Sequence, residues 1–326
     1  MKTVDSFPEL AICATMSAGK STFLNALLGA DYFPSSNMAC TAKISSILNT
    51  NLNINPSADC LFSAKRMSNG QIVTNLANRT RLEEWNRDDS VKQIYLVGKF
   101  QNISTQFIAH DTPGTNNSLH LDHRNITYQF LSENPPNIIA FVINAENNGS
   151  NDEIEFLRQL KDRFDDKRGP KFIFIVNKMD SPDFEREDLH GFLQDTLNDL
   201  TNLGFEKPLI FPVSAHAALL FRMILNERSL NRKESRALVS YYDYFTTDGL
   251  NLTKTNSSVT EDAPNTSINF LGKNYSVASL YTAIRRTGIC DFEEFLAAQF
   301  QKLKEDTSHL KFIPAAGQPN YKHRSR

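Results

Sequence analysis

The stretch that decides the fold is Ala14-Thr15-Met16-Ser17-Ala18-Gly19-Lys20-Ser21. It matches the pattern of a phosphate-binding loop, with Ala14 standing where the pattern has its first glycine. The apolar run at 10–13 predicts a short buried strand before it, and residues 21–28 predict a helix that ends at Gly29. Strand, loop and helix in this order form the context that the motif requires. Ala14 fits if the loop takes no positive φ there, because a Cβ would otherwise cost about 1–2 kcal/mol of strain.

A loop of this kind holds the phosphates of a nucleotide mainly through its backbone. The N–H groups of Ala18, Gly19, Lys20, Ser21 and Thr22 lie at the positive end of the predicted helix, where they are expected to bind two phosphates. The Lys20 ammonium is expected to reach the terminal phosphates, and the Ser21 hydroxyl to bind Mg²⁺. An ordinary strand-to-helix turn is the alternative interpretation, and the surrounding pattern favours nucleotide binding.

A second motif, Asp111-Thr112-Pro113-Gly114, directly follows a predicted strand at 105–109. Asp111 is expected to hold Mg²⁺ through water, and the Gly114 N–H is expected to contact the γ-phosphate. A simple turn after a strand explains these four residues equally well when they are taken alone.

A third motif, Asn177-Lys178-Met179-Asp180, follows the apolar run at 171–176. The Asp180 carboxylate can accept two hydrogen bonds, from N1 and N2 of guanine. Adenine lacks those donors, so the motif favours GTP over ATP. Lys178 is expected to lie over the base, and Asn177 to tie the surrounding loops together.

Two weaker signals complete the set. Ser214-Ala215 follows a predicted strand at 208–213, and the Ala215 N–H is expected to donate to guanine O6. Thr41 lies in the polar segment 32–42, where a threonine can close on Mg²⁺ and the γ-phosphate and release them after hydrolysis. Its position alone leaves open whether it does so.

Along the rest of the chain, apolar runs alternate with amphipathic segments. The pattern predicts strands at 43–49, 59–64, 136–144, 171–176 and 208–213, helices at 76–85, 122–131, 151–164, 184–203, 276–285 and 291–304, and an antiparallel hairpin formed by 92–100 and 105–109. This alternation predicts an α/β fold with a mostly parallel sheet and helices on both faces. The polar segment 226–275 breaks the rhythm and is interpreted as a surface insertion or a partly disordered segment.

Together these residues resemble the GTPase domain of the dynamin-like large GTPases, particularly the bacterial members. The resemblance is carried by residues 15–22 and 25–29, Pro34, Thr41, the motifs at 111–114 and 177–180, and the segment 287–296. It implies a P-loop GTPase fold that extends over 1–306, with the polar insertion at 226–275 and a tail at 307–326. It also implies a GTPase domain without the helical stalk of the family.

The resemblance assigns a role to each matching residue. Lys20 and Ser21 become the phosphate and Mg²⁺ residues, and Ser17 offsets charge at the β–γ bridging oxygen, with K⁺ as a possible helper. Thr41 orients the attacking water, and Asp111 and Gly114 form a switch, so that the catalytic set is Ser17, Lys20 and Thr41. The metal set is Ser21, Thr41 and Asp111.

Position 16 departs from the family pattern. Dynamins that hydrolyse GTP quickly have glutamine there, and Met16 cannot donate the hydrogen bond that helps to position water. Thr115, and not glutamine, follows Gly114. These two differences predict slow hydrolysis or help from a second molecule, and the alternative is a low-turnover GTP-binding switch that acts through a partner.

Composition limits the partners and the compartment. With 35 basic and 37 acidic residues, the chain has no general attraction to nucleic acid or to an anionic membrane. The four cysteines are not spaced as a metal site, and no signal peptide or membrane span is evident. The expected protein is therefore cytoplasmic, with GTP and GDP as ligands. The resemblance adds a second GTPase domain or a stalk-bearing chain as a partner, and contact with the periphery of a membrane.

Overall fold

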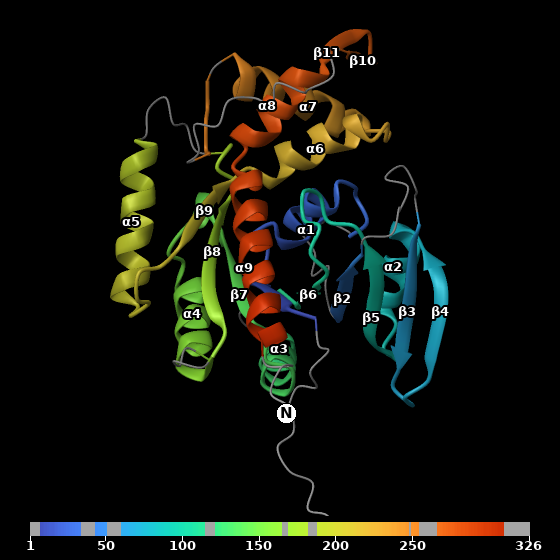
Figure 1. Ribbon diagram of the computed structural model, residues 1–326, viewed down its shortest axis with the longest axis vertical. Coiled ribbons are helices and arrows are strands. Elements are labelled where there is room, and N and C mark those ends of the chain that lie inside the picture. The colour runs from blue at the N-terminus through green and yellow to red at the C-terminus, as the bar shows by residue number, and fades with distance from the viewer. Residues whose placement is uncertain are drawn as a thin grey trace, which may run out of the picture.

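The computed structural model describes residues 7–33, 43–50, 60–114, 121–164, 169–181, 188–247, 249–253 and 266–309 (Figure 1). Within these residues, nine strands form one sheet in the order β4-β3-β5-β2-β6-β1-β7-β8-β9. The strands are β1 (Glu9–Ala14), β2 (Ile44–Asn49), β3 (Leu61–Met67), β4 (Ile72–Ala77), β5 (Val91–Gly98), β6 (Ile108–Asp111), β7 (Ile138–Asn144), β8 (Lys171–Asn177) and β9 (Ile210–Val213).

The helices connect these strands and continue beyond the last of them. They are α1 (Lys20–Leu28), α2 (Arg79–Arg87), α3 (Leu121–Glu133), α4 (Asn151–Phe164), α5 (Leu189–Asn202), α6 (Ala215–Leu225), α7 (Arg232–Thr246), α8 (Val277–Arg286) and α9 (Ile289–His309), with a short 3₁₀ turn, η1 (Ala145–Asn147). A separate antiparallel hairpin joins β10 (Ser267–Phe270) to β11 (Lys273–Ser276). Among the residues that the structure describes, no helix has the length and apolar character needed to cross a membrane.

The sheet is mostly parallel, as the sequence predicts. Strands β6, β1, β7, β8 and β9 run parallel to one another, and β2 runs parallel to β5. The antiparallel pairs are β2 with β6, β3 with β5 and β3 with β4. Strand β7 is buried over its whole length, which agrees with its continuous apolar sequence, since a parallel strand is covered on both faces.

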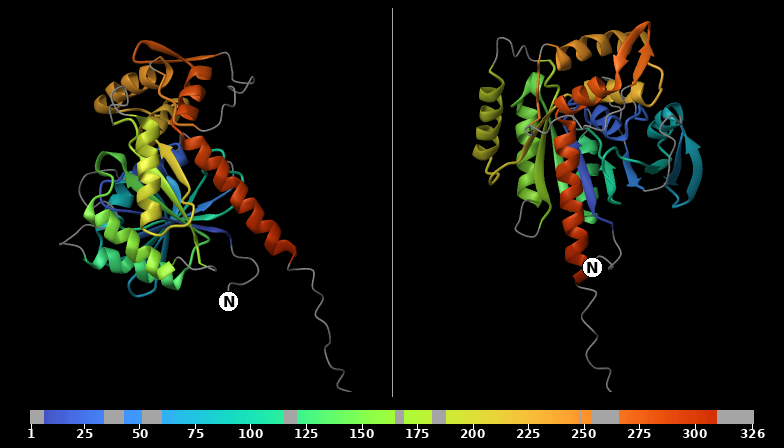
Figure 2. Two further views of the ribbon diagram at one scale, coloured as in Figure 1. Left: turned by 90° about the vertical axis from the view of Figure 1, so that its left-hand side faces the viewer. Right: turned by 45° about the horizontal axis from the view of Figure 1, so that its top comes forward.

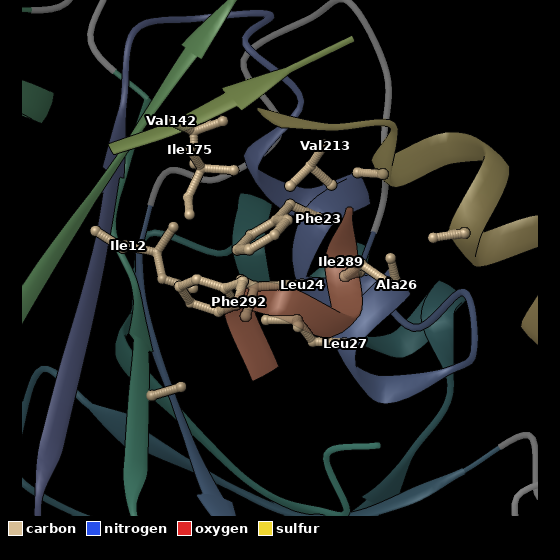
Figure 3. Close-up of a cluster of buried hydrophobic side chains, with 14 of the residues drawn as sticks. Ile12, Phe23, Leu24, Ala26, Leu27, Val142, Ile175, Val213, Ile289 and Phe292 are labelled. Atoms are coloured by element: carbon tan, nitrogen blue, oxygen red, sulfur yellow. The ribbon is translucent and has the colours of Figure 1, made fainter. Parts of the chain in front are cut away.

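Helices cover both faces of the sheet (Figure 2). On one face, Ile12 and Val142 of the sheet meet Phe23 of α1 and Phe292 of α9 in a fully buried cluster (Figure 3). The rings of Phe23 and Phe292 pack edge to face, with their centroids 5.1 Å apart. Helix α9, at the end of the described chain, therefore packs on α1, the helix that follows the phosphate-binding loop.

The opposite face is covered by α4 and its neighbours. Phe141 of β7 alternates with Val142 and points away from it, so that its ring lies 5.5 Å from the ring of Phe156 in α4. Both side chains are fully buried. The predicted fold class, an α/β fold with helices on both faces, is confirmed.

The helix predicted at 76–85 is partly wrong. Residues 76 and 77 belong to β4, an edge strand that the sequence analysis did not predict, and α2 begins only after Asn78. The Asn78 side chain caps this helix by accepting a hydrogen bond from the Arg81 N–H at 3.0 Å. Strand β4 has the sequence IVTNLA and is mostly exposed. Its apolar residues come in pairs and do not alternate with polar ones, and alternation is the pattern by which a half-buried strand is predicted. The turn before it contains Gly70 at φ 86°, which allows the reversal of direction.

The predicted hairpin of 92–100 and 105–109 is also wrong. Its strands exist as β5 and β6, but β2 lies between them. The side chain of Asn49, at the end of β2, holds the connection in place. It donates to the carbonyl oxygens of Ile103 and Thr105 at 3.0 and 2.7 Å and accepts from the Phe100 N–H at 2.9 Å. The connection therefore wraps around the end of β2.

The segment 226–275 contains elements that the sequence analysis did not place. Helix α7 begins with a capping box in which Asn231 and Glu234 bond each other's backbone N–H groups. Leu238 and Phe245 of α7 are fully buried. Helix α7 and the β10–β11 hairpin lie with α6 and α8 above one edge of the sheet (Figure 1). The division of the chain into a domain at 1–306 and a tail at 307–326 stays a prediction, and residues 310–326 lie outside the described residues.

Candidate nucleotide-binding site

The loop between β1 and α1 takes its positive φ values at Ser17 (63°) and Gly19 (87°), and Ala14 is the last residue of β1. Gly19 is the residue that this backbone requires, because a Cβ there would lie 2.4 Å from Nδ2 of Asn177. Lys20, Ser21 and Thr22 then form the first turn of α1. Their free N–H groups point out of the helix N-terminus, which is the geometry of an anion-binding site.

Asp111 lies directly beside this loop. It is the last residue of β6, opposite Ile12 of β1 in the parallel pair. Its fully buried carboxylate forms an ion pair with the Lys20 ammonium, which is 6% exposed. Next to it, the Thr112 hydroxyl donates to the Ile12 carbonyl oxygen at 2.8 Å. A Cβ on Gly114 would lie 3.6 Å from the Cα of Met16. The backbone of the 111–114 motif therefore lies against the phosphate-binding loop.

Asn177, at the end of β8, joins three segments of the chain. Its Nδ2 donates to the Ala18 carbonyl oxygen at 2.9 Å, and its Oδ1 accepts from the Ala215 N–H at 3.1 Å. Asn177 is 2% exposed. The phosphate-binding loop, the 177–180 loop and the start of α6 are therefore held together by one buried amide.

The 177–180 loop also places Asp180 and Lys178. Asp180 Oδ1 accepts a hydrogen bond from the Ser214 hydroxyl at 2.5 Å. Lys178 has a φ of 66°, and its ammonium pairs with Oε2 of Glu146 at 2.5 Å. Hydrogen bonding to Lys178 and to Ser181 outweighs partial burial and keeps the pKa of Glu146 below its ordinary value. Met179, between the two, is fully buried.

Sequence reasoning missed Glu146. Its position carried a usable signal, since it follows the apolar run of β7 by two residues, at the carboxyl edge where parallel sheets bind ligands. The carboxylate fixes the Lys178 side chain and balances its charge. One more acidic side chain than expected therefore lies beside the 177–180 loop.

The structure gathers most of the predicted residues at the carboxyl ends of β1, β6, β8 and β9. Two groups result. The phosphate end contains Ser17, Ala18, Gly19, Lys20, Ser21, Thr22, Asp111 and Gly114, and the base end contains Asn177, Lys178, Asp180, Ser214 and Ala215. Thr41, Pro34 and Thr115 lie outside the described residues.

The donor set at the phosphate end suits a magnesium ion. The Ser21 hydroxyl and the Asp111 carboxylate are hard oxygen ligands, which Mg²⁺ prefers. A magnesium ion bound together with a nucleotide needs only one or two protein oxygens, because phosphates and water complete its shell.

Comparisons with known proteins agree with this geometry. A probable chloroplastic transmembrane GTPase, FZO-like, from Arabidopsis thaliana is 27% identical over 212 residues, which are 64% of this chain and 19% of that protein. An uncharacterized protein in the xynA 3′ region of Caldicellulosiruptor sp. (strain Rt8B.4) is 24% identical over 227 residues, which are 68% of this chain and 52% of that protein. The chain thus spans about half of the length of one curated relative and about a fifth of the other.

Among solved structures, one chain of an oligomerised bacterial dynamin pair superposes with a TM-score of 0.55 at 15% identity, covering 94% of this chain and 48% of that chain. That pair is described as a mechanism for the long-range sensing and tethering of membranes. At this identity the likeness shows the fold, which is that of a P-loop GTPase. The model of the dynamin family matches residues 10–179, from β1 through the phosphate-binding loop and Asp111 to the first three residues of the 177–180 motif. Since that match covers more than half of the sequence, the chain belongs to the dynamin family.

Proposed function

We propose that this chain binds GTP with Mg²⁺ and hydrolyses it to GDP and phosphate. The observation that carries the proposal is the amide of Asn177, which bonds the phosphate-binding loop on one side and the start of α6 on the other. Through it, the phosphate end and the base end of the site form one unit that a single nucleotide can span.

At the phosphate end, the N–H groups of residues 18–22 would bind the phosphate oxygens, and Lys20 would reach the β- and γ-phosphates. Ser17 would offset the charge that develops on the bridging oxygen, with K⁺ as a helper. Catalysis of phosphoryl transfer depends mainly on such positioning and electrostatic stabilisation. Lys20 pairs with Asp111 in this structure, so each of these side chains would exchange its present partner for nucleotide or metal.

Ser21 and Asp111 would hold Mg²⁺, with Thr41 as a third ligand. Bound there, the ion would neutralise charge on the β- and γ-phosphate oxygens. Thr41 would also orient the water that attacks the γ-phosphorus in line with the bond to the departing GDP. No covalent intermediate is part of this reaction.

At the base end, Asp180 would accept hydrogen bonds from guanine N1 and N2, and the Ala215 N–H would donate to O6. The Ala215 N–H is at present bonded to Asn177 Oδ1 at 3.1 Å, so guanine O6 would share this donor. Lys178 would lie over the base, held by Glu146. These contacts would select guanine over adenine.

A low-turnover switch is the second candidate, and Met16 favours it. The backbone of Met16 lies beside Gly114, close to where the γ-phosphate would lie, and its thioether cannot donate a hydrogen bond to water. In either case we propose a second GTPase domain or a stalk-bearing chain as partner. A cytoplasmic location with peripheral membrane contact completes the proposal.

The test is GTP hydrolysis per molecule, with Mg²⁺ and K⁺, over a wide range of protein concentration. A specific rate that rises with concentration supports a GTPase whose site is completed by a second copy. A flat rate near zero with GTP still bound supports the switch.

Two variants test the site itself. Lys20→Ala should abolish binding or turnover, and wild-type turnover in this variant would refute the phosphate site. Asp180→Asn should weaken the preference for GTP over xanthosine triphosphate, and unchanged discrimination would exclude the proposed role of Asp180.

A further inference from the structure

The end of the sheet formed by β5, β3 and β4 (Figure 1) carries a pocket on the face opposite α2. The ring centroid of Trp85 in α2 lies 5.5 Å from Nζ of Lys65 in β3, so α2 covers the face to which Lys65 points. Side chains alternate along a strand, so Ala64 and Arg66 point to the other face. There a pocket of about 1040 Å³ is lined by residues of β1 to β6 and of the end of α3. This volume is about the upper limit of small-molecule sites.

Five apolar side chains form a row across this pocket, one from each of five neighbouring strands. The strand registers place them side by side. In order, the row consists of Leu76 (β4), Phe62 (β3), Val97 (β5), Leu48 (β2) and Ile108 (β6). Phe62 and Leu76 are 68% and 50% exposed. The pocket therefore offers a continuous apolar surface across five strands.

A polar row runs beside the apolar row, and its hydrogen bonds are made within the protein. The Tyr95 hydroxyl donates to Oε1 of Gln93 at 2.9 Å, and Nε2 of Gln93 donates to the Ser46 hydroxyl at 3.1 Å. The Ser46 oxygen lies 2.9 Å from Nδ1 of His110, whose Nε2 lies 3.3 Å from Oε2 of Glu9. An apolar chain that lies over this row therefore leaves each of these groups with a hydrogen-bond partner, which avoids the main cost of covering polar groups.

The charged side chains of the pocket lie at opposite ends. The Arg66 side chain, on β3, makes no ion pair or hydrogen bond with any residue that the structure describes. Glu9 of β1 and Glu133 of α3 line the other end. An anionic group is therefore attracted to Arg66 and repelled from the end at β1. A carboxylate suits Arg66 because it can accept two parallel hydrogen bonds from a guanidinium.

The distance from Arg66 to the far end of the apolar row sets the length of the ligand. Ile108 lies three strands away from Arg66, or about 14 Å, and four residues further along the strands, or about 13 Å. The direct path is then about 19 Å long. It passes Ala64, the smallest side chain of the polar row. An acyl chain spans about half of the ~30 Å hydrocarbon core of a bilayer, so a long chain fills most of this path.

We propose that this pocket binds one free long-chain fatty acid. Its carboxylate pairs with Arg66, and its chain passes Ala64 and crosses the apolar row to Ile108. The residues that carry this inference are not those of the candidate nucleotide site, so it does not depend on the proposed GTP hydrolysis.

The test measures displacement of a fluorescent fatty acid from the full chain by decanoate, laurate, myristate and palmitate, each below the concentration at which it forms micelles. Lauryl alcohol is the matched ligand, since it has the chain of laurate without the charge. Arg66→Gln removes the charge that binds the carboxylate, and Ala64→Phe places a ring in the path of the chain. The control is Arg87→Gln, at an exposed position in the last turn of α2. The melting temperature of each variant is recorded.

We expect the affinity to rise about tenfold or more for each pair of methylenes added between decanoate and myristate, because each buried methylene strengthens binding about fourfold. Arg66→Gln should weaken laurate binding about fivefold, the upper end for an exposed ion pair, and leave lauryl alcohol binding unchanged. Ala64→Phe should weaken binding of both ligands about tenfold or more, because its ring occupies the space that the chain needs. Arg87→Gln should bind both ligands as the wild type does.

An affinity that does not depend on chain length would overturn the inference. Equal effects of Arg66→Gln on laurate and lauryl alcohol, or wild-type laurate binding in a folded Ala64→Phe variant, would do the same. If Ala64→Phe does not fold, Arg66→Gln decides, because Arg66 is exposed.

Two other occupants of this face are distinguished by further measurements. If the chain sediments with phosphatidylglycerol vesicles but does not bind laurate, the face contacts a membrane surface. If laurate does not bind and Ala64→Phe dissociates a dimer in analytical ultracentrifugation, the face is an interface between two copies of the chain. Either result overturns the fatty-acid site.

Discussion

A buried ion pair joins α6 to α9, and its loss should be costly. Nη1 and Nη2 of Arg222 lie 2.7 and 2.8 Å from the two carboxylate oxygens of Glu293. Nη1 also donates to the Ala26 carbonyl oxygen at 2.6 Å, and Asn102 donates to Glu293 at 2.8 Å. Arg222 is 4% exposed and Glu293 is fully buried. Burial opposes the charge of Arg222, but the Glu293 carboxylate outweighs it and keeps the guanidinium pKa above its ordinary value.

Glu293→Gln keeps the shape of the side chain, removes its charge and replaces one accepting oxygen by an NH2 donor. The guanidinium then stays charged in a dry environment with neutral partners, and breaking such a buried pair costs about 3–5 kcal/mol. The control is Glu294→Gln, the same substitution one residue later on α9. Glu294 pairs with Arg285 at 3.1 Å, but its side chain is 51% exposed, so its loss should cost less than about 1 kcal/mol.

Urea unfolding followed by far-ultraviolet circular dichroism measures both variants against the wild type. The free energies of unfolding are compared only where the slopes agree, because a changed slope signals a changed unfolded or folded state. A difference between the two variants of about 2–5 kcal/mol is the expected result. If the two variants differ by less than about 1 kcal/mol, the ion pair does not stabilise the junction of α1, α6 and α9.

Three further perturbations test other parts of the structure. Gly288 and Gly272 both have a φ of 78°. A Cβ at position 288 would lie 2.0 Å from the Pro212 carbonyl oxygen, whereas a Cβ at position 272 would have no atom within 4 Å. Gly288→Ala should therefore cost about 1–3 kcal/mol more than Gly272→Ala in urea unfolding, and equal costs would contradict the close approach. Burial raises the pKa of Glu153 to about 7 from an ordinary 4.5, so the folded chain binds more protons than the unfolded chain between these values. The free energy of unfolding should fall by about 3 kcal/mol as pH rises through this range. Glu153→Gln should remove this fall. If the pH dependence is unchanged in Glu153→Gln, the fall does not come from Glu153. Met16→Gln should raise kcat about tenfold or more by adding a donor beside the γ-phosphate, and an unchanged kcat at normal GTP affinity would show that position 16 does not limit turnover.

Much of the fold could be predicted from the sequence because the relevant signals are local. Strands β7 and β8 are uninterrupted apolar runs, and α4 was predicted with the bounds that the structure has. The hairpin prediction for β5 and β6 failed for a non-local reason. Strand β2 inserts between β5 and β6, and Asn49 at its end bonds the connection between them from more than fifty residues earlier in the chain.

The candidate site likewise contains residues that the sequence predicts and residues that it does not. Motif residues could be predicted because a nucleotide demands particular residue types directly after particular strands. The contact of Tyr241 with His216 could not, because it depends on the packing of α7 on α6, and a tyrosine on an amphipathic helix carries no signal of its own. Helix α7 was itself missed since only a few of its residues, Leu238 and Phe245 among them, are buried apolar side chains.

The contact between Gly19 and Asn177 couples the structures of two motifs that are distant in sequence. The glycine of a phosphate-binding loop is usually explained by the approach of a phosphate to the backbone. Here a Cβ at position 19 would first meet the Asn177 amide, at 2.4 Å. A side chain at 19 would push that amide away from the Ala18 carbonyl oxygen, 159 positions earlier in the chain, and would also disturb its bond to the Ala215 N–H. The phosphate-binding loop therefore depends on a residue of the 177–180 motif, and the bonds of Asn177 depend on the absence of a side chain at position 19.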